Sequence, residues 1–188
     1  MDAFDLSEAG ADVVIADIAM GGAEKTSEEI RARGRKSFAL RMDVTRNDEV
    51  KEGVARIKRE LGSVDILVNS AATLDHLGQI LDQKEDLWER DLRVNLTGSY
   101  HCSQAVWPSM KEKGWGRIIN MASVAGTLGG FGQASYSTTK AGIIGLTKTL
   151  ALEGARYGIN CNVVCPGIIN SESFRLIPPE MRERLIKR

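Results

Sequence analysis

The stretch Gly116-Arg-Ile-Ile-Asn-Met-Ala-Ser123 reads as a short buried strand that delivers a serine at its carboxyl end. The segment Val124 to Ala134 that follows holds four glycines and predicts a loop. Beyond it, the residues of 134–157 predict a long helix that is apolar around most of its circumference. A buried strand that leads into a long helix is typical of a parallel sheet covered by helices.

The same alternation runs through the whole sequence. Strands are predicted at 12–17, 37–43, 64–70, 116–122 and 159–165, and helices at 3–9, 21–33, 47–61, 85–113 and 134–157. This pattern predicts a Rossmann-like, doubly wound α/β fold with helices on both faces of the sheet. The length of 188 residues, without a repeat or a linker, indicates one domain over 1–188.

Tyr136 and Lys140 stand four residues apart in Ser135-Tyr-Ser-Thr-Thr-Lys-Ala141 and so emerge on the same face of the predicted helix. An ammonium beside a phenol favours the phenolate, which suits the tyrosine to proton transfer. On its own, such a pair more often lies on a solvated helix face. Here Ser123 ends a predicted strand, and ligands bind outside the carboxyl ends of strands in open α/β sheets. A hydroxyl, a phenol and an ammonium are therefore expected to converge.

These residues resemble the classical short-chain dehydrogenase/reductase family, in particular its 3-oxoacyl-acyl-carrier-protein reductase-like branch. The segments that carry the resemblance are Ala9 to Asp17, Met42 to Thr45, Asp65 to Ala72, Val94 to Gly98, Ser123, Tyr136 to Lys140, and Cys165 to Gly167. They follow the family's order and spacing along nearly the whole chain. A lone Tyr-x-x-x-Lys pattern is weak evidence, whereas the ordered series is specific.

The resemblance implies an oxidoreductase that transfers a hydride between NAD(P) and a secondary alcohol or ketone. It implies that Ser123 holds the substrate oxygen, that Tyr136 is the general acid/base and that Lys140 tunes it and binds the nicotinamide ribose. Asn95 would anchor a water in the proton relay. The cofactor would carry the harder chemistry, which leaves one proton for the protein to move. An asparagine in an amphipathic helix is otherwise usually a surface or bridging residue.

Asp17 bears on the choice of cofactor. A carboxylate at the end of this strand binds the adenine-ribose hydroxyls in dinucleotide folds and repels a 2′-phosphate, so NAD is expected over NADP. The alternative is an acidic residue that opens a loop or caps a helix. Where the family usually reads Asn-Asn-Ala-Gly, this chain reads Asn69-Ser-Ala-Ala72. The expected cofactor-binding residues are Asp17, Ile18, Asp43, Val44, Asn69, Ser70, Ala71, Tyr136, Lys140, Pro166, Gly167 and Ile169.

No residues before Asp17 match the family's first strand and its glycine-rich, pyrophosphate-binding turn, and no residues near 188 match its last strand. In the strand order 3-2-1-4-5-6 the first strand lies at the centre of the sheet. Two apolar strand edges would then face a gap, and the chain is expected to be a fragment of a longer enzyme. It would bind NAD poorly and be marginally folded, because the pyrophosphate loses its main-chain amides.

Composition sets further limits. Lys plus Arg and Asp plus Glu number 25 each, so charge favours neither nucleic acid nor anionic lipid as a partner. The sequence contains no stretch of about 20 apolar residues and no signal peptide, and three free cysteines suit a reducing cytosol, so a cytoplasmic location is expected. Neither histidine stands in a cluster with metal-ligand spacing, so no metal site is expected.

Two other readings stay open: a non-catalytic fragment or pseudoenzyme with weak cofactor binding, and a binding protein that reuses the fold. The helices at 85–113 and 134–157 carry apolar residues on more than one face. The resemblance implies that they form the interface of a homodimer or homotetramer, and the alternative is that both sides are buried within one subunit. The substrate cannot be narrowed beyond a small-molecule secondary alcohol or ketone.

Overall fold

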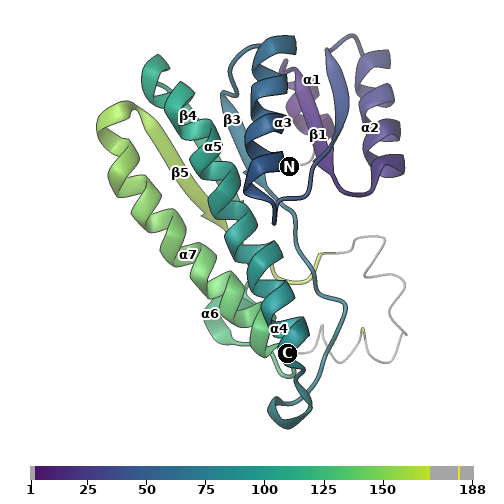
Figure 1. Ribbon diagram of the computed structural model, residues 1–188, viewed down its shortest axis with the longest axis vertical. Coiled ribbons are helices and arrows are strands. Elements are labelled where there is room, and N and C mark those ends of the chain that lie inside the picture. The colour runs from purple at the N-terminus through teal and green to yellow at the C-terminus, as the bar shows by residue number, and fades with distance from the viewer. Residues whose placement is uncertain (1–2, 170–181, 183–188) are drawn as a thin grey trace.

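The computed structural model describes residues 3–169 and 182, in which parallel strands alternate with helices (Figure 1). The strands are β1 (Val13–Asp17), β2 (Ser37–Arg41), β3 (Ile66–Asn69), β4 (Gly116–Met121) and β5 (Ile159–Val164). The α-helices are α1 (Ala3–Glu8), α2 (Met20–Ala32), α3 (Asn47–Glu60), α4 (Glu85–Asp91), α5 (Gly98–Lys113), α6 (Ala125–Leu128) and α7 (Ala134–Gly154). Short 3-10 turns cover Ile80–Asp82 and Ala155–Tyr157. The predicted strands are confirmed to within a few residues at their ends.

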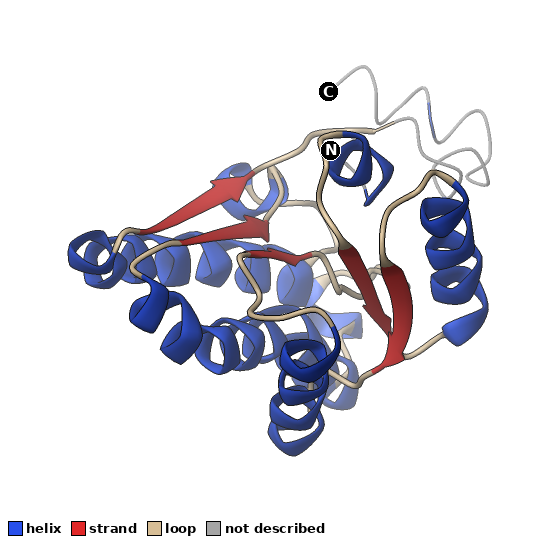
Figure 2. Ribbon diagram, turned by 90° about the horizontal axis from the view of Figure 1, so that it is seen from above, coloured by secondary structure: helices blue, strands red, loops and turns tan. Residues whose placement is uncertain are grey.

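The strands fall into two parallel sheets, β1-β2 and β3-β4-β5. In the described part of the chain no strand lies between β1 and β3, so the predicted gap at the centre of the sheet is confirmed (Figure 2). Ile66, the first residue of β3, is 38% exposed. The observed order matches the doubly wound order 3-2-1-4-5-6 with its first strand absent.

Helices α5 and α7 lie side by side over β4 and β5, and α2 packs against β1 and β2 (Figures 1 and 2). One hydrophobic cluster joins α5 to β4 and β5 through Val106, Met110, Ile118, Ile159 and Cys161. Another joins β2 to α3 and α5 through Leu40, Met42, Val50 and Cys102. These clusters fix the strands on which the candidate site is built.

The segment from Val124 to Ala134 is not a plain loop, which corrects the prediction from its glycines. It contains the short helix α6, and the Ser123 hydroxyl just before this helix accepts a hydrogen bond from the Ala125 amide at 3.2 Å. Gly126 is needed there for contact rather than for flexibility. A Cβ at this position would lie 2.6 Å from the Lys140 carbonyl carbon, so only glycine lets α6 pack against α7.

The helix predicted over 85–113 is also interrupted. Residues Leu92–Thr97 form a π-helical segment between α4 and α5, and this segment contains Asn95. One-turn π segments inside α-helices occur frequently at functional sites. No hydropathy pattern distinguishes the π turn from the α-helix on either side, so the sequence predicts one continuous helix.

No helix in the described ranges combines the length and apolarity that a membrane span requires.

Candidate active site

The predicted site residues gather at one edge of the molecule, where the parallel strands end. Asp17 and Asn69 are the last residues of β1 and β3, Asp43 lies two residues beyond β2, and Ser123 lies two residues beyond β4. Pro166 follows β5, and its carbonyl accepts a hydrogen bond from the Val124 amide at 3.0 Å. The structure therefore brings these five positions to the edge at which open α/β sheets bind ligands.

Lys140 is the most strongly perturbed charge of the site. Its side chain is buried, with 3% of the residue exposed, and its Nζ donates to the main-chain carbonyl of Met121 at 2.7 Å. Burial lowers the pKa of Lys140 from 10.5 to about 8. Buried lysines with lowered pKa values are frequent at functional sites, because desolvation disfavours the ammonium.

Tyr136 and Lys140 share a face of α7, as their spacing predicts. The Lys140 Nζ lies 5.5 Å from the centroid of the Tyr136 ring. Ser123 is half-buried at the end of β4, and α6 begins with its hydroxyl as an acceptor. Phenol, ammonium and hydroxyl thus occupy the junction of β4, α6 and α7.

Asn95 is completely buried, and its amide is used within the protein. Its Nδ2 donates to the Thr73 carbonyl at 3.1 Å and to the Thr139 hydroxyl at 3.3 Å, and its Oδ1 accepts from the Thr73 amide at 2.7 Å. Thr139 belongs to α7, so the asparagine ties the loop after β3 to the helix that carries Tyr136. The expected role of Asn95 in a water relay stays a prediction.

Among the expected cofactor-binding residues, Asp43 and Val44 lie in the turn after β2. The Asp43 carboxylate accepts hydrogen bonds from the Thr45 hydroxyl at 2.7 Å and the Thr45 amide at 2.8 Å, and these bonds lower the pKa of Asp43. Val44 packs against Gly98 so closely that a Cβ on this glycine would lie 2.5 Å from Val44 Cγ2. The glycine in Asn-Leu-Thr-Gly98 therefore sets the distance between α5 and the turn after β2.

Asp17 and Ile18 are exposed at the end of β1, with the Asp17 carboxylate 2.8 Å from the Ala19 amide. Arg41 is the register partner of Asp17 on β2, and its side chain is 66% exposed. Neighbouring residues in register on parallel strands project to the same face of the sheet. An acid and a base consequently stand side by side where β1 and β2 end, and the base comes from the neighbouring strand rather than from the residues that follow Asp17.

Asn69 points into the fold. Its Nδ2 donates to the Asn120 side chain at 2.8 Å and contacts Ser103 at 3.2 Å, and Asn120 in turn donates to Thr147 on α7 at 2.8 Å. The Asn69 side chain thus joins β3 to β4 and α5, and Asn120 extends this network to α7. By contrast, Ser70, Ala71, Gly167 and Ile169 are exposed at the same edge. Their contribution to cofactor binding stays a prediction.

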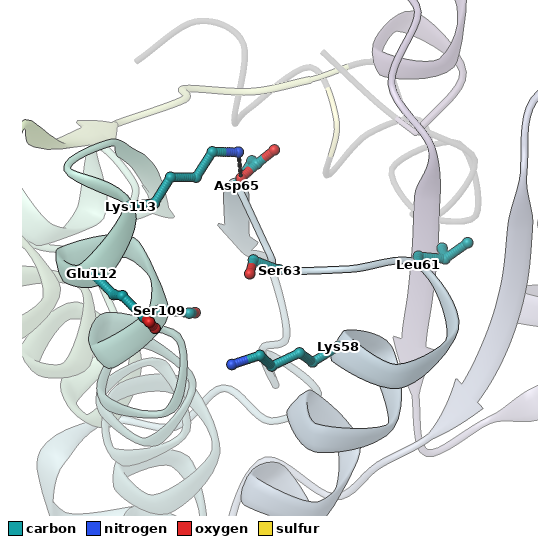
Figure 3. Close-up of a pocket in the computed structure, with 7 residues that line it drawn as sticks. All are labelled: Lys58, Leu61, Ser63, Asp65, Ser109, Glu112 and Lys113. Carbon is teal, nitrogen blue, oxygen red and sulfur yellow. Dashed lines mark hydrogen bonds and ion pairs between the residues drawn. The ribbon is translucent and has the colours of Figure 1, made fainter.

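A surface hollow of about 550 Å³ lies away from these residues, at the amino end of β3 (Figure 3). Figure 3 shows the Lys113 ammonium against the Asp65 carboxylate, an ion pair of 2.6 Å. The hollow is lined by Lys58, Leu61, Ser63, Asp65, Ser109, Glu112 and Lys113. None of these is a candidate site residue, and strand topology favours the opposite edge, so we do not place the site here.

The sequence profile of short chain dehydrogenases matches residues 3–181 of the chain. The chain belongs to the short-chain dehydrogenase family. It is 42% identical over 166 residues to a 3-oxoacyl-(acyl-carrier-protein) reductase of Staphylococcus epidermidis, an alignment that covers 88% of the chain and 67% of the relative. It is 41% identical over 146 residues to the acetoacetyl-CoA reductase of Shinella zoogloeoides, covering 77% and 60%.

Among solved structures, a gluconate 5-dehydrogenase from Burkholderia cenocepacia in complex with NADP and tartrate superimposes with a TM-score of 0.86. Its sequence is 34% identical, and the match covers 92% of our chain and 68% of that one. The chain thus spans about two thirds of the length of these relatives. The expected preference for NAD over NADP is not supported, since the gluconate 5-dehydrogenase structure contains NADP.

Sequence reasoning missed four polar residues that surround Tyr136 and Asn95, namely Thr73, Asp91, Ser135 and Thr139. Asp91 is completely buried and Ser135 is 2% exposed. One signal was present in the sequence: Asp91 lies four residues before Asn95, about one helical turn, on a helix otherwise expected to bury apolar residues. Without the fold, however, its hydroxyl partners could not be named.

Proposed function

We propose that this protein transfers a hydride between a nicotinamide dinucleotide and a secondary alcohol or ketone, with Tyr136 as the general acid/base. The observation that carries the proposal is the buried Lys140 ammonium 5.5 Å from the Tyr136 ring, at the sheet edge where Ser123 also lies. A binding protein that reuses the fold has no need of a buried cation beside a phenol, because burial of that charge costs stability.

The described residues fit the two ends of the cofactor. At the adenosine end, Asp17 and Arg41 are exposed side by side, and Val44 presents a half-buried apolar face. At the nicotinamide end, Lys140 and Tyr136 share one face of α7. When bound, the dinucleotide supplies or accepts the hydride.

The protein's own part is to hold the substrate oxygen and move one proton. Ser123 donates its hydroxyl hydrogen to the substrate oxygen. In the oxidative direction Tyr136 removes the proton of the carbinol, and in the reductive direction it returns this proton to the carbonyl oxygen. The Lys140 ammonium stabilises the negative charge on the phenolic oxygen during either transfer. Asn95 keeps the loop after β3 against α7, the helix that carries Tyr136 and Lys140.

The decisive experiment replaces Tyr136 with Phe, which removes only the phenolic oxygen. We expect turnover to fall at least about a hundredfold, the usual contribution of a general acid/base. Binding of NADH or NADPH, measured by energy transfer from tryptophan, should stay within about twofold. Tyr157→Phe on the 3-10 turn after α7 is the matched control and should leave both quantities unchanged. Acetoacetyl-CoA and gluconate, taken from the names of the relatives, are the first substrates to try.

If Tyr136→Phe kept its rate within about tenfold of the parent, a loss of only about 1.4 kcal/mol, the assigned acid/base would be wrong. The second candidate function, a non-catalytic protein with weak cofactor binding, is favoured by one observation: the described residues lack a strand and glycine turn between β1 and β3. Absence of energy transfer with both cofactors, in a folded chain, would support this second candidate.

A further inference from the structure

Asp91 is a buried carboxylate that the proposed chemistry does not use. It is the last residue of α4, none of its surface is exposed, and it precedes the π-helical segment that contains Asn95. A buried charge costs several kcal/mol unless donors surround it, so such a residue needs a structural or functional reason.

Its two oxygens receive hydrogen bonds from different parts of the site. Asp91 Oδ2 accepts from the Ser135 hydroxyl at 2.6 Å, and Ser135 is the neighbour of Tyr136 in the first turn of α7. Asp91 Oδ1 accepts from the Thr73 hydroxyl at 2.7 Å, and Thr73 lies in the loop after β3. One carboxylate therefore holds both the catalytic helix and the loop that faces it.

The remaining hydrogen bonds close a ring that begins and ends on α7, on either side of Tyr136 in the sequence. The Thr73 amide donates to Asn95 Oδ1 at 2.7 Å, and Asn95 Nδ2 donates to the Thr139 hydroxyl at 3.3 Å. Ser135 and Thr139 are four residues apart on α7, so both ends of the ring reach the same helix face. The path runs from α7 at Ser135 through Asp91, Thr73 and Asn95 back to α7 at Thr139.

The charge of Asp91 is balanced at the surface. Arg90 Nη2 donates to Asp91 Oδ1 at 3.1 Å, and the same guanidinium forms a two-point contact with the more exposed Asp75. His76 Nε2 lies 3.7 Å from Asp91 Oδ2. Because a carboxylate is an acceptor only, it can take all of these donors at once, whereas an asparagine amide would turn hydrogens toward one of them.

We propose that Asp91 is a positioning residue of the active site, which holds Tyr136 and Asn95 in register through Ser135 and Thr73. It acts on the proposed reaction only through these neighbours. The inference on its role in turnover rests on the proposed function, whereas its role in holding the ring does not. The test therefore begins with a measurement on the chain without cofactor or substrate.

The first readout is amide hydrogen exchange at Thr73, whose N–H is bonded to Asn95. Asp91→Asn and Thr73→Val should each speed this exchange at least about tenfold. Ser135→Ala removes only the hydrogen bond from Ser135 to Asp91 and should speed this exchange severalfold, because Asp91 also accepts the hydrogen bond from Thr73. Asp86→Asn is the matched control on an exposed carboxylate of the same helix and should leave the exchange unchanged.

The second readout is the split between turnover and binding. In a chain that turns over substrate, Asp91→Asn should lower kcat at least about tenfold while the Kd of the dinucleotide stays within about twofold. Double replacement with Ser135→Ala should lower kcat by much less than the product of the single effects, since both act through one path. Additive effects, or unchanged Thr73 exchange in a folded Asp91→Asn chain, would overturn the proposal.

Should Asp91→Asn fail to fold, Ser135→Ala and Thr73→Val remain as tests, since each removes one hydroxyl and leaves the carboxylate with Arg90. If neither variant changed hydrogen exchange of the main-chain amide at position 73, the proposal that Asp91 holds this hydrogen-bonded ring together would be wrong. If the exchange effects appeared but no variant or parent turned over substrate, the ring would stand and the proposed function would fail.

Discussion

Replacement of Lys140 by Met should make the chain more stable at neutral pH while it abolishes activity. Methionine has a similar length but no charge, so it fills the space of the buried lysine stem without the desolvation cost. Burial lowers the pKa of Lys140 from 10.5 to about 8. At about 1.4 kcal/mol per pH unit, the charged side chain costs folding about 3 kcal/mol at neutral pH.

The sign of the pH dependence follows from proton counting. Below about pH 8 the lysine is protonated in both the folded and the unfolded chain, and the whole cost is present. Between about pH 8 and 10.5 the unfolded chain binds more protons than the folded chain, so the contribution of Lys140 to stability improves as the pH rises. The parent and the Met variant should therefore converge in stability near pH 10.5.

The assay is urea unfolding of the parent and of Lys140→Met at about pH 7 and about pH 10. Buried Cys102 and Cys161, whose pKa values burial raises from 9.0 to about 11, lower the stability of both chains as the pH rises through that range. Their effect cancels in the difference between the two chains. A variant that is less stable than the parent at pH 7, or a difference that does not change with pH, would refute the reasoning.

Three further predictions concern packing, the cofactor and assembly. Gly98→Ala should lower the free energy of unfolding by about 1–3 kcal/mol, because its Cβ would lie 2.5 Å from a Val44 methyl. Gly145→Ala is the control, since its Cβ would meet nothing within 4 Å. Equal urea midpoints for the two variants would contradict the close contact. Asp17→Asn should raise the affinity for NADPH relative to NADH about tenfold, since the carboxylate repels a 2′-phosphate. Arg41→Ala should lower this relative affinity. Titration with both cofactors measures the ratio of the two affinities, and an unchanged ratio in Asp17→Asn would show that Asp17 does not belong to the site. We propose that α5 and α7 form a homo-oligomer interface, for which the 82% exposed Leu152 is one apolar contact; light scattering should show a dimer or tetramer, and a stable monomer at micromolar concentration would contradict it.

Much of the fold could be predicted because period and length identify its elements. Apolar runs such as Ile118 and Ile119 between turns indicate strands, and the alternation with helices leaves few topologies. The gap between β1 and β3 could be predicted from a resemblance that named a strand with no counterpart. The π segment and α6 could not be predicted, because their packing involves residues distant in sequence: Gly126 of α6 lies against Lys140, and Asn95 of the π segment bonds to Thr73 and Thr139.

The site shows the same division. Tyr136 and Lys140 could be predicted from their spacing on one helix, and Ser123 from its position at a strand end. The inward orientation of Asn69 toward Asn120 could not be predicted, because a residue at a strand end can face either way. Asp91 and Thr73 are 18 residues apart in sequence, so only the folded chain reveals that they meet.

The π turn at Leu92–Thr97 has a consequence for how this chain tolerates change in length. Each residue of an α-helix advances the side-chain direction by about 100°, and a π turn accommodates one residue more than an α turn. If Leu92–Thr97 wound as a regular α-helix with no residue removed, all of α5 would rotate by about 100° relative to α4. Asp91 would still face the ring, whereas Ser99, Ser103 and Val106 would turn away from the sheet. Loss of one residue from this segment would instead give a regular helix whose two halves keep their present phase. The segment thus sets the rotation of α5 relative to α4, so that α4 directs Asp91 toward the candidate site while α5 directs Val106 into the core.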